Sequence, residues 1–330
     1  MTIRALIIGA ALAVALVVVS TAAAEITLYQ KELGSDPNYT ISDGLGYAAS
    51  VSISREPPDV FGAPRYAVRD TRRISYSNLA SSDEDFCEAD LLSGAPFQWT
   101  RWVCRYLSRV TVELNDLDDR LVALDVATKF TVAAGTGNDF LQTSNGTDVL
   151  RGGAGNDTLF GGANDDTLEG GGGDDLLAGQ AGSDSIDGGD GIDTATYATA
   201  TAQVVVTFDD TANDGVSGEE DNVESNVERL IGGSGNDRLT GSSGANKLRG
   251  NGGNDNLRGE GGSDHLLGEG GDDRLTGGAG ADRIEGGAGA DIVEARGDGA
   301  VDTIFCGGGT DVVRADATDR VDISSCEVID

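Results

Sequence analysis

The chain has few aromatic residues, a single histidine and far fewer basic than acidic residues. Aromatic residues make up 5% of its 330 residues, whereas glycine contributes 50 residues. This leaves too little bulky material for the core of a conventional globular domain. Its one histidine, His265, excludes a histidine-ligated zinc protease, because such a site needs at least two. No G-x-S-x-G sequence or G-x-x-x-x-G-K phosphate loop is present either.

Long apolar runs are also scarce, and the one clear example lies at the start of the chain. Residues 5–19 are apolar, Arg4 precedes them and Ala22, Ala23 and Ala24 follow. This pattern predicts a secretory signal peptide over residues 1–24, with cleavage before Glu25. A retained membrane anchor is the alternative, although the run is shorter than the ~20 residues that span a bilayer. We therefore expect a secreted, extracellular protein with no membrane span in the mature chain.

The charge is strongly unbalanced. The chain has 23 Lys and Arg against 56 Asp and Glu, a formal net charge of −33. This excess disfavours nucleic acid and anionic lipid as partners. Much of the acid recurs at a fixed spacing, which indicates positioned carboxylates rather than a merely soluble surface.

Only four cysteines occur, and they fall into two local pairs. Cys87 with Cys104 and Cys306 with Cys326 are the expected disulfides, which suit an oxidising exterior. Each disulfide would close a loop of about 20 residues and stabilise the fold by about 3 kcal/mol. The sequence alone leaves this connectivity a guess.

What the chain has in abundance is a nine-residue repeat, as in residues 152–160, GGAGNDTLF. Seven units fill residues 134–196, seven fill 232–294, and two follow at 297–305 and 306–314. The sixth position is Asp in fifteen of the sixteen units, with Asn246 the exception. These residues are Asp139, Asp148, Asp157, Asp166, Asp175, Asp184, Asp193, Asp237, Asp255, Asp264, Asp273, Asp282, Asp291, Asp302 and Asp311.

The other positions of the repeat predict a solenoid. The eighth residue is Leu, Ile or Val in fifteen units, and the glycines permit tight turns on either side of a short strand. Two units make one 18-residue coil, and successive coils stack as parallel strands roughly 4.8 Å apart. We therefore expect an all-β parallel β-roll. A disordered linker is the alternative for such a composition, but the periodic aliphatic residue argues against it.

Stacked coils bring the sixth-position carboxylates into columns. Neighbouring like charges at this spacing repel by about 1 to 3 kcal/mol each, so the array needs cations. Calcium is the expected ion, because its oxygen ligands lie at about 2.3–2.6 Å and carboxylates with turn carbonyls suit a hard cation. All fifteen of these aspartates are predicted metal ligands. One ion for each gap within a column gives about ten Ca²⁺.

The repeats resemble the haemolysin-type calcium-binding nonapeptide, the RTX parallel β-roll. That resemblance implies that the sixth-position aspartates and the carbonyls of the glycine turns bind calcium between coils, and that folding awaits export. Two departures stand out: the predicted signal is N-terminal and cleavable, whereas many family members use an uncleaved C-terminal one. The repeats also usually accompany a catalytic or toxin domain, which the sequence does not reveal.

The remaining segments are assigned by their patterns. Residues 25–133 are expected to form an N-terminal β-rich domain, with strands near 51–54, 66–68 and 110–114. Residues 115–121 resemble a decayed repeat, so this domain could extend the solenoid. The first repeat block is 134–196 and the second 232–314. Residues 197–231 interrupt them with two expected strands, 203–208 and 223–231, forming a flap or a tolerated loop. Residues 315–330 are expected to form a C-terminal cap.

The functional prediction is a secreted, non-enzymatic calcium-binding protein, structural or adhesive, whose folding is coupled to calcium outside the cell. The alternative is an extracellular carbohydrate-active enzyme with its catalytic part in residues 25–133. A pore-forming toxin is a third and weaker hypothesis. Calcium ions are the expected partner, and a cell-surface or extracellular glycan or protein stays open. Trp99, Arg101, Trp102 and Arg105 form the one aromatic and basic cluster that would suit an anionic glycan.

Overall fold

The computed structural model describes residues 129–326 continuously, preceded by 38–42, 50–56, 65–70, 75–76, 87–91, 100–105, 109–114 and 118–124, and followed by 328–329. The predicted signal peptide lies outside these residues. The chain divides into two compact units, Met1–Gly153 and Ala154–Asp330. All regular structure in the described residues is β-strand, so this part of the chain contains no helix that could cross a membrane.

The first unit mixes parallel and antiparallel strand pairs. Parallel pairs join β1 to β7, β7 to β9, β2 to β8 and β8 to β10. Antiparallel pairs join β1 to β4, β2 to β3, β3 to β6 and β5 to β6. The strands are β1 (Asn38–Ser42), β2 (Ser50–Glu56), β3 (Arg65–Asp70), β4 (Ser75–Tyr76), β5 (Cys87–Leu91), β6 (Thr100–Arg105), β7 (Arg109–Glu113), β8 (Arg120–Leu124), β9 (Lys129–Thr136), β10 (Phe140–Gln142) and β11 (Val149–Ala154). Parallel strands of the solenoid type therefore occur before residue 134.

Several sequence expectations for this unit hold. The strands predicted near 51–54, 66–68 and 110–114 lie within or overlap β2, β3 and β7. The decayed repeat at 115–121 leads into β8, whose Leu121 pairs in register with Leu141 of β10.

Other expectations for this unit stay predictions. The antiparallel register of β5 and β6 sets Cys87 opposite Cys104, which is the arrangement that their predicted disulfide requires. Of the aromatic and basic cluster, Trp99 lies outside the described residues, and its other members lie in β6. A glycan-binding role for this cluster is therefore untested.

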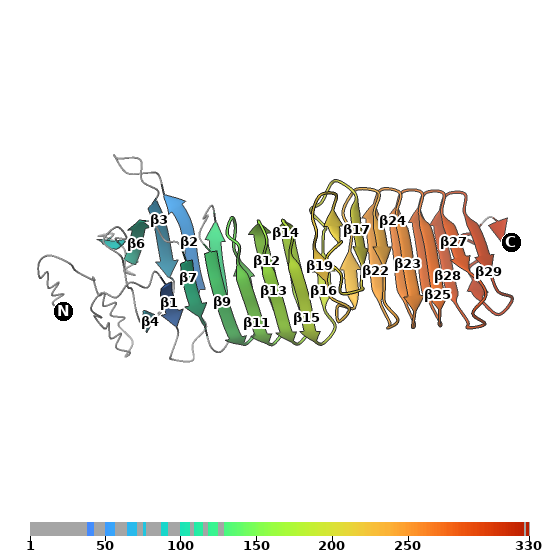
Figure 1. Cartoon of the computed structure of the whole chain (residues 1–330). Helices are drawn as coiled ribbons and strands as arrows, with labels where there is room; N and C mark the ends of the chain where they lie inside the picture. Colours follow the sequence, from blue (N-terminus) through green and yellow to red (C-terminus); the bar gives the residue numbers. More distant parts are fainter. Residues whose placement is uncertain are drawn as a thin grey trace, which may run out of the picture. The chain divides into compact units, whose positions relative to one another are not determined.

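The second unit contains the parallel β-solenoid that the repeat predicts. The strands are β12 (Thr158–Ala163), β13 (Thr167–Gly172), β14 (Leu176–Ala181), β15 (Ser185–Asp190), β16 (Thr194–Thr196), β17 (Val204–Thr207), β18 (Gly215–Val216), β19 (Asn222–Val223), β20 (Arg229–Ile231), β21 (Arg238–Thr240), β22 (Lys247–Gly252), β23 (Asn256–Gly261), β24 (His265–Gly270), β25 (Arg274–Ala279), β26 (Arg283–Ala288), β27 (Ile292–Ala295), β28 (Thr303–Gly308), β29 (Val312–Ala315), β30 (Arg320–Val321) and β31 (Val328–Ile329). Figure 1 shows them stacked side by side.

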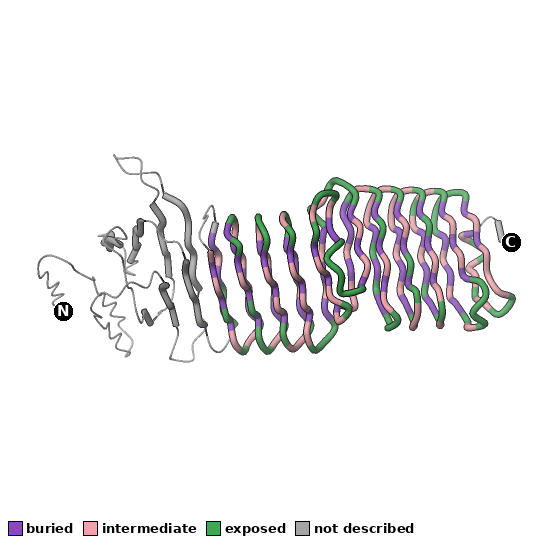
Figure 2. The backbone as a smooth tube through the Cα atoms, viewed as in Figure 1, coloured by how far each residue is buried: buried purple, intermediate pink, exposed green. Residues whose placement is uncertain are grey.

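The register of these strands follows the repeat. Alternate strands pair in parallel, 18 residues apart, so that Leu159 lies beside Leu177 and Leu248 beside Leu266. The eighth-position side chains are 0–1% exposed from Leu141 to Val313. Figure 2 shows buried and intermediate residues alternating along the strands that it colours by burial, with exposed residues gathered at the turns. The core is therefore a thin double row of aliphatic side chains.

Glycine is required where the backbones of neighbouring coils meet. Gly189, at the second position of its repeat, has φ of 98°, and a Cβ there would lie 2.0 Å from the carbonyl oxygen of Gly171 in the preceding coil. Not every second-position residue is glycine: Gln180, Asn251, Glu260 and Glu269 also have positive φ, between 72° and 81°. These residues accept the strain of a left-handed backbone because the stacked strands on either side fix the turn.

The interruption at 197–231 supplies strands to the solenoid and also contains an antiparallel pair, β17 with β18. The two strands expected there are wrong in detail: β17 is shorter than predicted, and the segment 223–231 divides into β19 and β20. A turn separates the last two, closed by the Val227 N–H donating to the Glu224 carbonyl. β19 pairs with β15, β20 joins β16 to β22, and β17 pairs with β21. The segment thus adds strands of its own to the stack.

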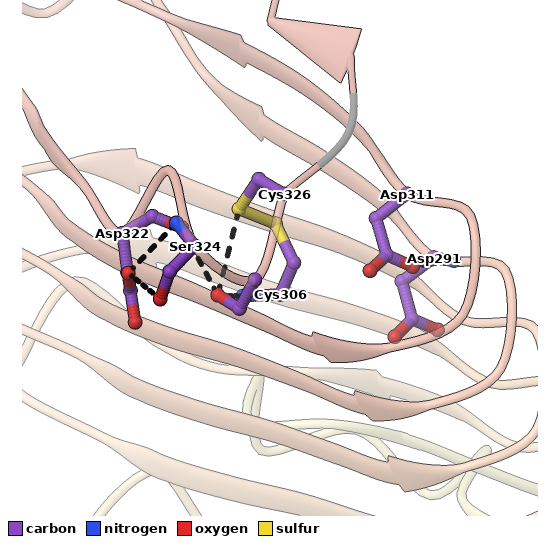
Figure 3. The surroundings of a disulfide bond; sticks show 7 residues. Asp291, Cys306, Asp311, Asp322, Ser324 and Cys326 are labelled. Carbon is purple, nitrogen blue, oxygen red and sulfur yellow. Dashed lines mark hydrogen bonds between the residues drawn. A yellow bond between two sulfur atoms is a disulfide. The ribbon is translucent and has the colours of Figure 1, made fainter.

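The C-terminal residues continue both sheets. β30 pairs with β28 and β31 with β29, so the last full coil is covered. The predicted disulfide between Cys306 and Cys326 is present, with 5.2 Å between the two Cα atoms. Figure 3 shows it beside Asp322, whose carboxylate accepts hydrogen bonds from the N–H and hydroxyl of Ser324.

Candidate metal sites

The sixth-position aspartates are buried. All fifteen predicted ligands are 0–2% exposed, although each lies next to a turn. The stacking places them in the columns expected from the 18-residue period. The second unit has three columns. The first contains Asp157, Asp175, Asp193, Asp264, Asp282 and Asp302, and the second contains Asp166 and Asp184. The third contains Asp237, Asp255, Asp273, Asp291 and Asp311. In the first unit, Oδ1 of Asp139 accepts the N–H of Asp119, and Oδ1 of Asp148 accepts the N–H of Phe130.

One oxygen of each carboxylate joins neighbouring coils. The backbone N–H of Asp175 donates to Oδ1 of Asp193 at 2.8 Å, and the N–H of Asp255 donates in the same way to Oδ1 of Asp273 at 2.8 Å. The same bond recurs down both columns of the second block, between 2.7 and 2.9 Å. Each aspartate therefore satisfies a backbone donor of the preceding coil. Figure 3 shows two such side chains, Asp291 and Asp311, on adjacent coils.

The second oxygen has no such partner. Oδ2 is fully buried and accepts no hydrogen bond in eight of these residues: Asp175, Asp184, Asp193, Asp255, Asp264, Asp273, Asp282 and Asp291. An unsatisfied buried polar group costs about 1–3 kcal/mol, and more when it is charged. Eight of them cost on the order of 10 kcal/mol or more, which is comparable with the whole stability of a typical domain. A cation coordinated by these oxygens would remove this cost.

Burial also raises the pKa of these carboxyls. The pKa of Asp255, Asp264 and Asp273 rises to about 7, mainly because burial penalises the charged form and secondly because the next carboxylate of the column lies close by. The backbone N–H on Oδ1 opposes this rise. Burial likewise raises the pKa of Asp184 to about 7 and of Asp193 to about 6. Without a cation, the carboxyls with a pKa of about 7 are partly protonated near neutral pH.

Backbone oxygens lie next to the unpaired carboxylate oxygens. A Cβ built on Gly259, the first residue of its repeat, would lie 2.2 Å from Oδ2 of Asp264 and 2.5 Å from the carbonyl oxygen of Gly277. Gly268 has the same surroundings, with Oδ2 of Asp273 at 2.3 Å and the Gly286 carbonyl oxygen at 2.4 Å. Carboxylate and carbonyl oxygens together form the donor set that hard cations such as Ca²⁺ prefer. The residues present therefore fit calcium.

The site does not consist of side chains alone. Among the described residues, no three carboxylate, imidazole or thiolate side chains converge on one point. Any ion held here must take several of its ligands from the backbone. The carboxylate and carbonyl oxygens around these aspartates favour calcium over zinc or copper, which prefer nitrogen and sulfur donors.

At three positions around the interruption, the side chain in a column accepts a hydrogen bond from another protein group. The Tyr197 hydroxyl donates to Oδ2 of Asp221 at 2.9 Å, and the Gly233 N–H donates to Oδ2 of Asp237 at 2.6 Å. At the third rung, Asn246 stands in place of Asp, and its Oδ1 accepts from the Ser242 N–H at 2.7 Å. Asp237 is therefore a predicted ligand whose Oδ2 already has a protein donor.

The nine-residue frame misses several residues that act as rungs. Asp221, Glu228 and Asp319 accept the backbone N–H groups of Asp184, Asp193 and Asp302. Asp119 occupies the equivalent place in the first unit and is 3% exposed. Each of these four acids stands two residues before an aliphatic residue: Leu121, Val223, Leu230 and Val321. That short acid-x-aliphatic pattern, free of the spacing, would have found them.

A second ladder, also missed, runs along the fifth position. The N–H of Asp272 donates to Oδ1 of Asn254, and the N–H of Ala290 donates to Oδ1 of Asp272. The direction is opposite to that of the sixth position, and these bonds lie at the exposed surface. His265 lies in β24 as a partly exposed strand residue, with Nε2 2.8 Å from Oε1 of Glu285. It takes no part in the columns.

Comparison with known families agrees with this geometry. The family model of the RTX calcium-binding nonapeptide repeat matches four segments: residues 133–168, 160–195, 231–266 and 267–299. These segments cover most of both repeat blocks and stop on either side of the interruption. No curated protein matches the chain.

Proposed function

We propose that the chain is a secreted calcium-binding β-roll protein whose folding is coupled to Ca²⁺ outside the cell, and that its role is structural or adhesive rather than catalytic. The RTX repeats imply calcium binding. The coupling to folding, the export and the role are the proposed part. The single observation that carries the proposal is the buried, unpaired Oδ2 atom repeated along the columns.

Each aspartate then has two functions. Oδ1 accepts the N–H of the preceding coil and fixes the register, whereas Oδ2 faces the first-position glycine and a carbonyl oxygen of a neighbouring coil. Calcium held by these oxygens would neutralise the carboxylates and would coordinate the Oδ2 atoms that lack a hydrogen-bond partner. Because the ligand atoms come from separate coils, they lie together only in the folded state. Binding energy is then folding energy.

The columns set the number of ions. One ion for each gap between neighbouring aspartates gives about ten. The three rungs at Asp221, Asp237 and Asn246 have protein partners already, so we propose that the ions lie in two groups, one on each side of the interruption.

The proposed setting is extracellular. Extracellular calcium modules work at about 10⁻⁴ to 10⁻³ M, a concentration that the cytoplasm does not reach, so the chain would stay unfolded until export. The apolar run at residues 5–19 supports a cleaved N-terminal signal, and the disulfide between Cys306 and Cys326 suits the same compartment.

Circular dichroism of the full chain with and without a chelator tests the proposal. In about 10 mM calcium, above the range in which extracellular modules bind it, we expect a β spectrum, and chelator should convert it to that of an unfolded chain. Magnesium in place of calcium should not restore the β signal, because it demands stricter octahedral geometry. A β spectrum that chelator leaves unchanged would contradict the proposal.

A further inference from the structure

The coils at residues 229–320, which include the second repeat block, differ in surface charge from those at residues 129–196, which include the first. Residues 229–320 contain ten Lys or Arg, whereas residues 129–196 contain two. Eight of the sixteen Asp and Glu residues in 229–320 are buried sixth-position aspartates. This leaves eight other acidic residues against ten Lys and Arg. In residues 129–196, seven of twelve acids are buried in the same way, and two bases face five other acids. In a chain of net charge −33, the positive charge is thus concentrated on one part of the solenoid.

The strand register aligns several of these bases on one outer face. The seventh-position residues of β20, β22, β24, β26, β28 and β30 are direct parallel neighbours. We call this row the basic row; in order it contains Arg229, Lys247, His265, Arg283, Thr303 and Arg320. Their side chains are intermediate or exposed, opposite in direction to the buried eighth-position leucines. Figure 1 labels β22, β24 and β28 of this row.

Such a row is unfavourable for folding by itself. Like charges set directly opposite on neighbouring strands destabilise a sheet, and at a strand spacing of about 4.8 Å the cations lie close together. Glu285 relieves part of the row, because it pairs with His265 at 2.8 Å and with Arg283 at 2.8 Å. In contrast, no acidic side chain of the described residues forms an ion pair with Arg229 or Lys247. These two adjacent cations are available to a ligand.

The neighbouring row adds an aromatic surface. Phe305 of β28 faces outward beside this row, and the guanidinium of Arg283 lies 4.5 Å from the centre of its ring. Arg249 of β22 lies outward in the same row as Phe305, paired with Glu269 at 2.6 Å. A flat face with a line of cations and one aromatic ring suits a linear ligand that carries a negative charge at regular intervals. A sugar ring can stack its C–H face on the phenylalanine.

We propose that this face of β20–β30 binds an extended anionic polysaccharide, of the uronic-acid class. The advance per residue of such a chain is close to the strand spacing, so that two neighbouring carboxylates can meet Arg229 and Lys247 on adjacent strands. A single-stranded nucleic acid fits less well, because its binding sites combine cations with several aromatic side chains for base stacking. Among the outward residues of 229–320 that the structure describes, Phe305 is the one aromatic.

Polysaccharide binding would deepen the adhesive role, and it rests on the proposed calcium-dependent folding, because the row exists only when the coils are stacked. Binding and circular dichroism are therefore measured on the same samples. A loss of the calcium response would count against the proposed function. A folded, calcium-responsive protein that fails the binding test would overturn the polysaccharide site alone.

The experiment measures binding of the calcium-loaded full chain to a short oligogalacturonate, with a neutral cello-oligosaccharide and poly(dT) as comparison ligands. The double variant Arg229→Gln/Lys247→Gln removes two cations of the basic row that lie on adjacent strands and have no ion pair. The matched control, Arg238→Gln/Arg258→Gln, removes the same charge from β21 and β23, which belong to the other sheet. None of these four side chains belongs to the aspartate columns.

We expect saturable binding of the oligogalacturonate, weakened by rising salt, and no binding of the neutral sugar. The Arg229→Gln/Lys247→Gln pair should weaken binding by about fivefold or more, which corresponds to about 1 kcal/mol of binding free energy. The control pair should change it by less than about twofold. An equal loss in both pairs, which would indicate a net-charge effect, would overturn the proposed site. Absence of binding by the folded protein, or tighter binding of poly(dT), would do the same.

Discussion

At the residue scale, the two oxygens of a sixth-position aspartate have different environments. Oδ1 accepts a backbone N–H from the preceding coil, and Oδ2 is buried without a hydrogen-bond partner in residues such as Asp273. The neighbouring fifth-position residue, Asp272, lies closer to solvent and also accepts a backbone N–H. Substitutions of Asp273 and of Asp272 therefore distinguish the effect on stability of a charge in a column from that of an acidic residue in a turn.

Asp273→Asn should change stability in opposite directions with and without calcium. The amide keeps an oxygen for the Asp255 N–H but removes a buried charge, so the metal-free protein should be stabilised, while the calcium-loaded protein should lose about 1–3 kcal/mol. Urea unfolding in calcium and in chelator measures both effects.

Asp272→Asn is the matched control and should leave both stabilities nearly unchanged, because the amide oxygen can accept the same bond. If Asp273→Asn and Asp272→Asn behaved alike in calcium, the assignment of the sixth position as the ligand would be wrong.

The first-position glycine makes a second residue-scale prediction. Gly259→Ala places a methyl group against Oδ2 of Asp264 and the Gly277 carbonyl oxygen, so it should destabilise the calcium-loaded roll by about 1–3 kcal/mol. Gly252→Ala should be tolerated, since a Cβ there meets only the Gly270 carbonyl oxygen at 3.9 Å. Calcium affinity and thermal unfolding of the two variants give the comparison. Equal effects would show that this glycine does not border the ion.

At the scale of elements, the interruption at 197–231 is a section of solenoid held by protein groups. Asp214 links its strands, because Oδ1 accepts the Thr207 N–H and Oδ2 accepts the Val223 N–H. Tyr197 is buried and its hydroxyl donates to Asp221. One sheet continues across the interruption through β20, whereas the opposite face changes from a sheet that ends at β19 to one that begins at β18 and β17.

Tyr197→Phe removes the donor and leaves Oδ2 of Asp221 without this hydrogen bond. We expect a loss of about 1–3 kcal/mol that is of similar size at low and at saturating calcium, because the proposed arrangement places no ion between Tyr197 and Asp221. Thermal unfolding at several calcium concentrations tests this. A loss that saturating calcium fully reversed would show that an ion can bind at this rung as well.

The regular coils could be predicted from the sequence because each coil repeats the same pattern of glycine turn, aspartate and short strand. The buried eighth-position residues and the columns follow from spacing. The disulfide between Cys306 and Cys326 is a guess from the sequence that the structure confirms. The interruption could not be predicted in the same way, because its rungs come from Asp221 and Glu228, which stand outside the nine-residue frame. Which oxygen would lack a partner is a property of the stacked backbone and is not visible in the sequence.

At the scale of the whole molecule, many carboxyls with raised pKa values make stability depend on pH. For Asp255, Asp264 and Asp273, the folded pKa of about 7 lies above the ordinary value of 3.8. The folded protein therefore binds more protons than the unfolded one between these values. Stability of the metal-free protein is then highest at low pH and falls as the pH rises through about 7.

The expected result is that the metal-free chain is more folded at about pH 5 than at about pH 8, and that calcium abolishes the difference. Circular dichroism in chelator across this range provides the measurement. A metal-free protein that gained stability with rising pH would show that the buried carboxyls are not the controlling groups.

The location of the ions tests the central claim most directly. Crystals of the calcium-bound protein, measured by anomalous diffraction, would show each calcium as a peak. We expect peaks beside the Oδ2 atoms of the columns, such as those of Asp175, Asp264 and Asp273, and none between Tyr197 and Asp221. Peaks at the fifth-position residues instead, or columns without peaks in calcium-saturated crystals, would contradict the assignment of these aspartates as calcium ligands.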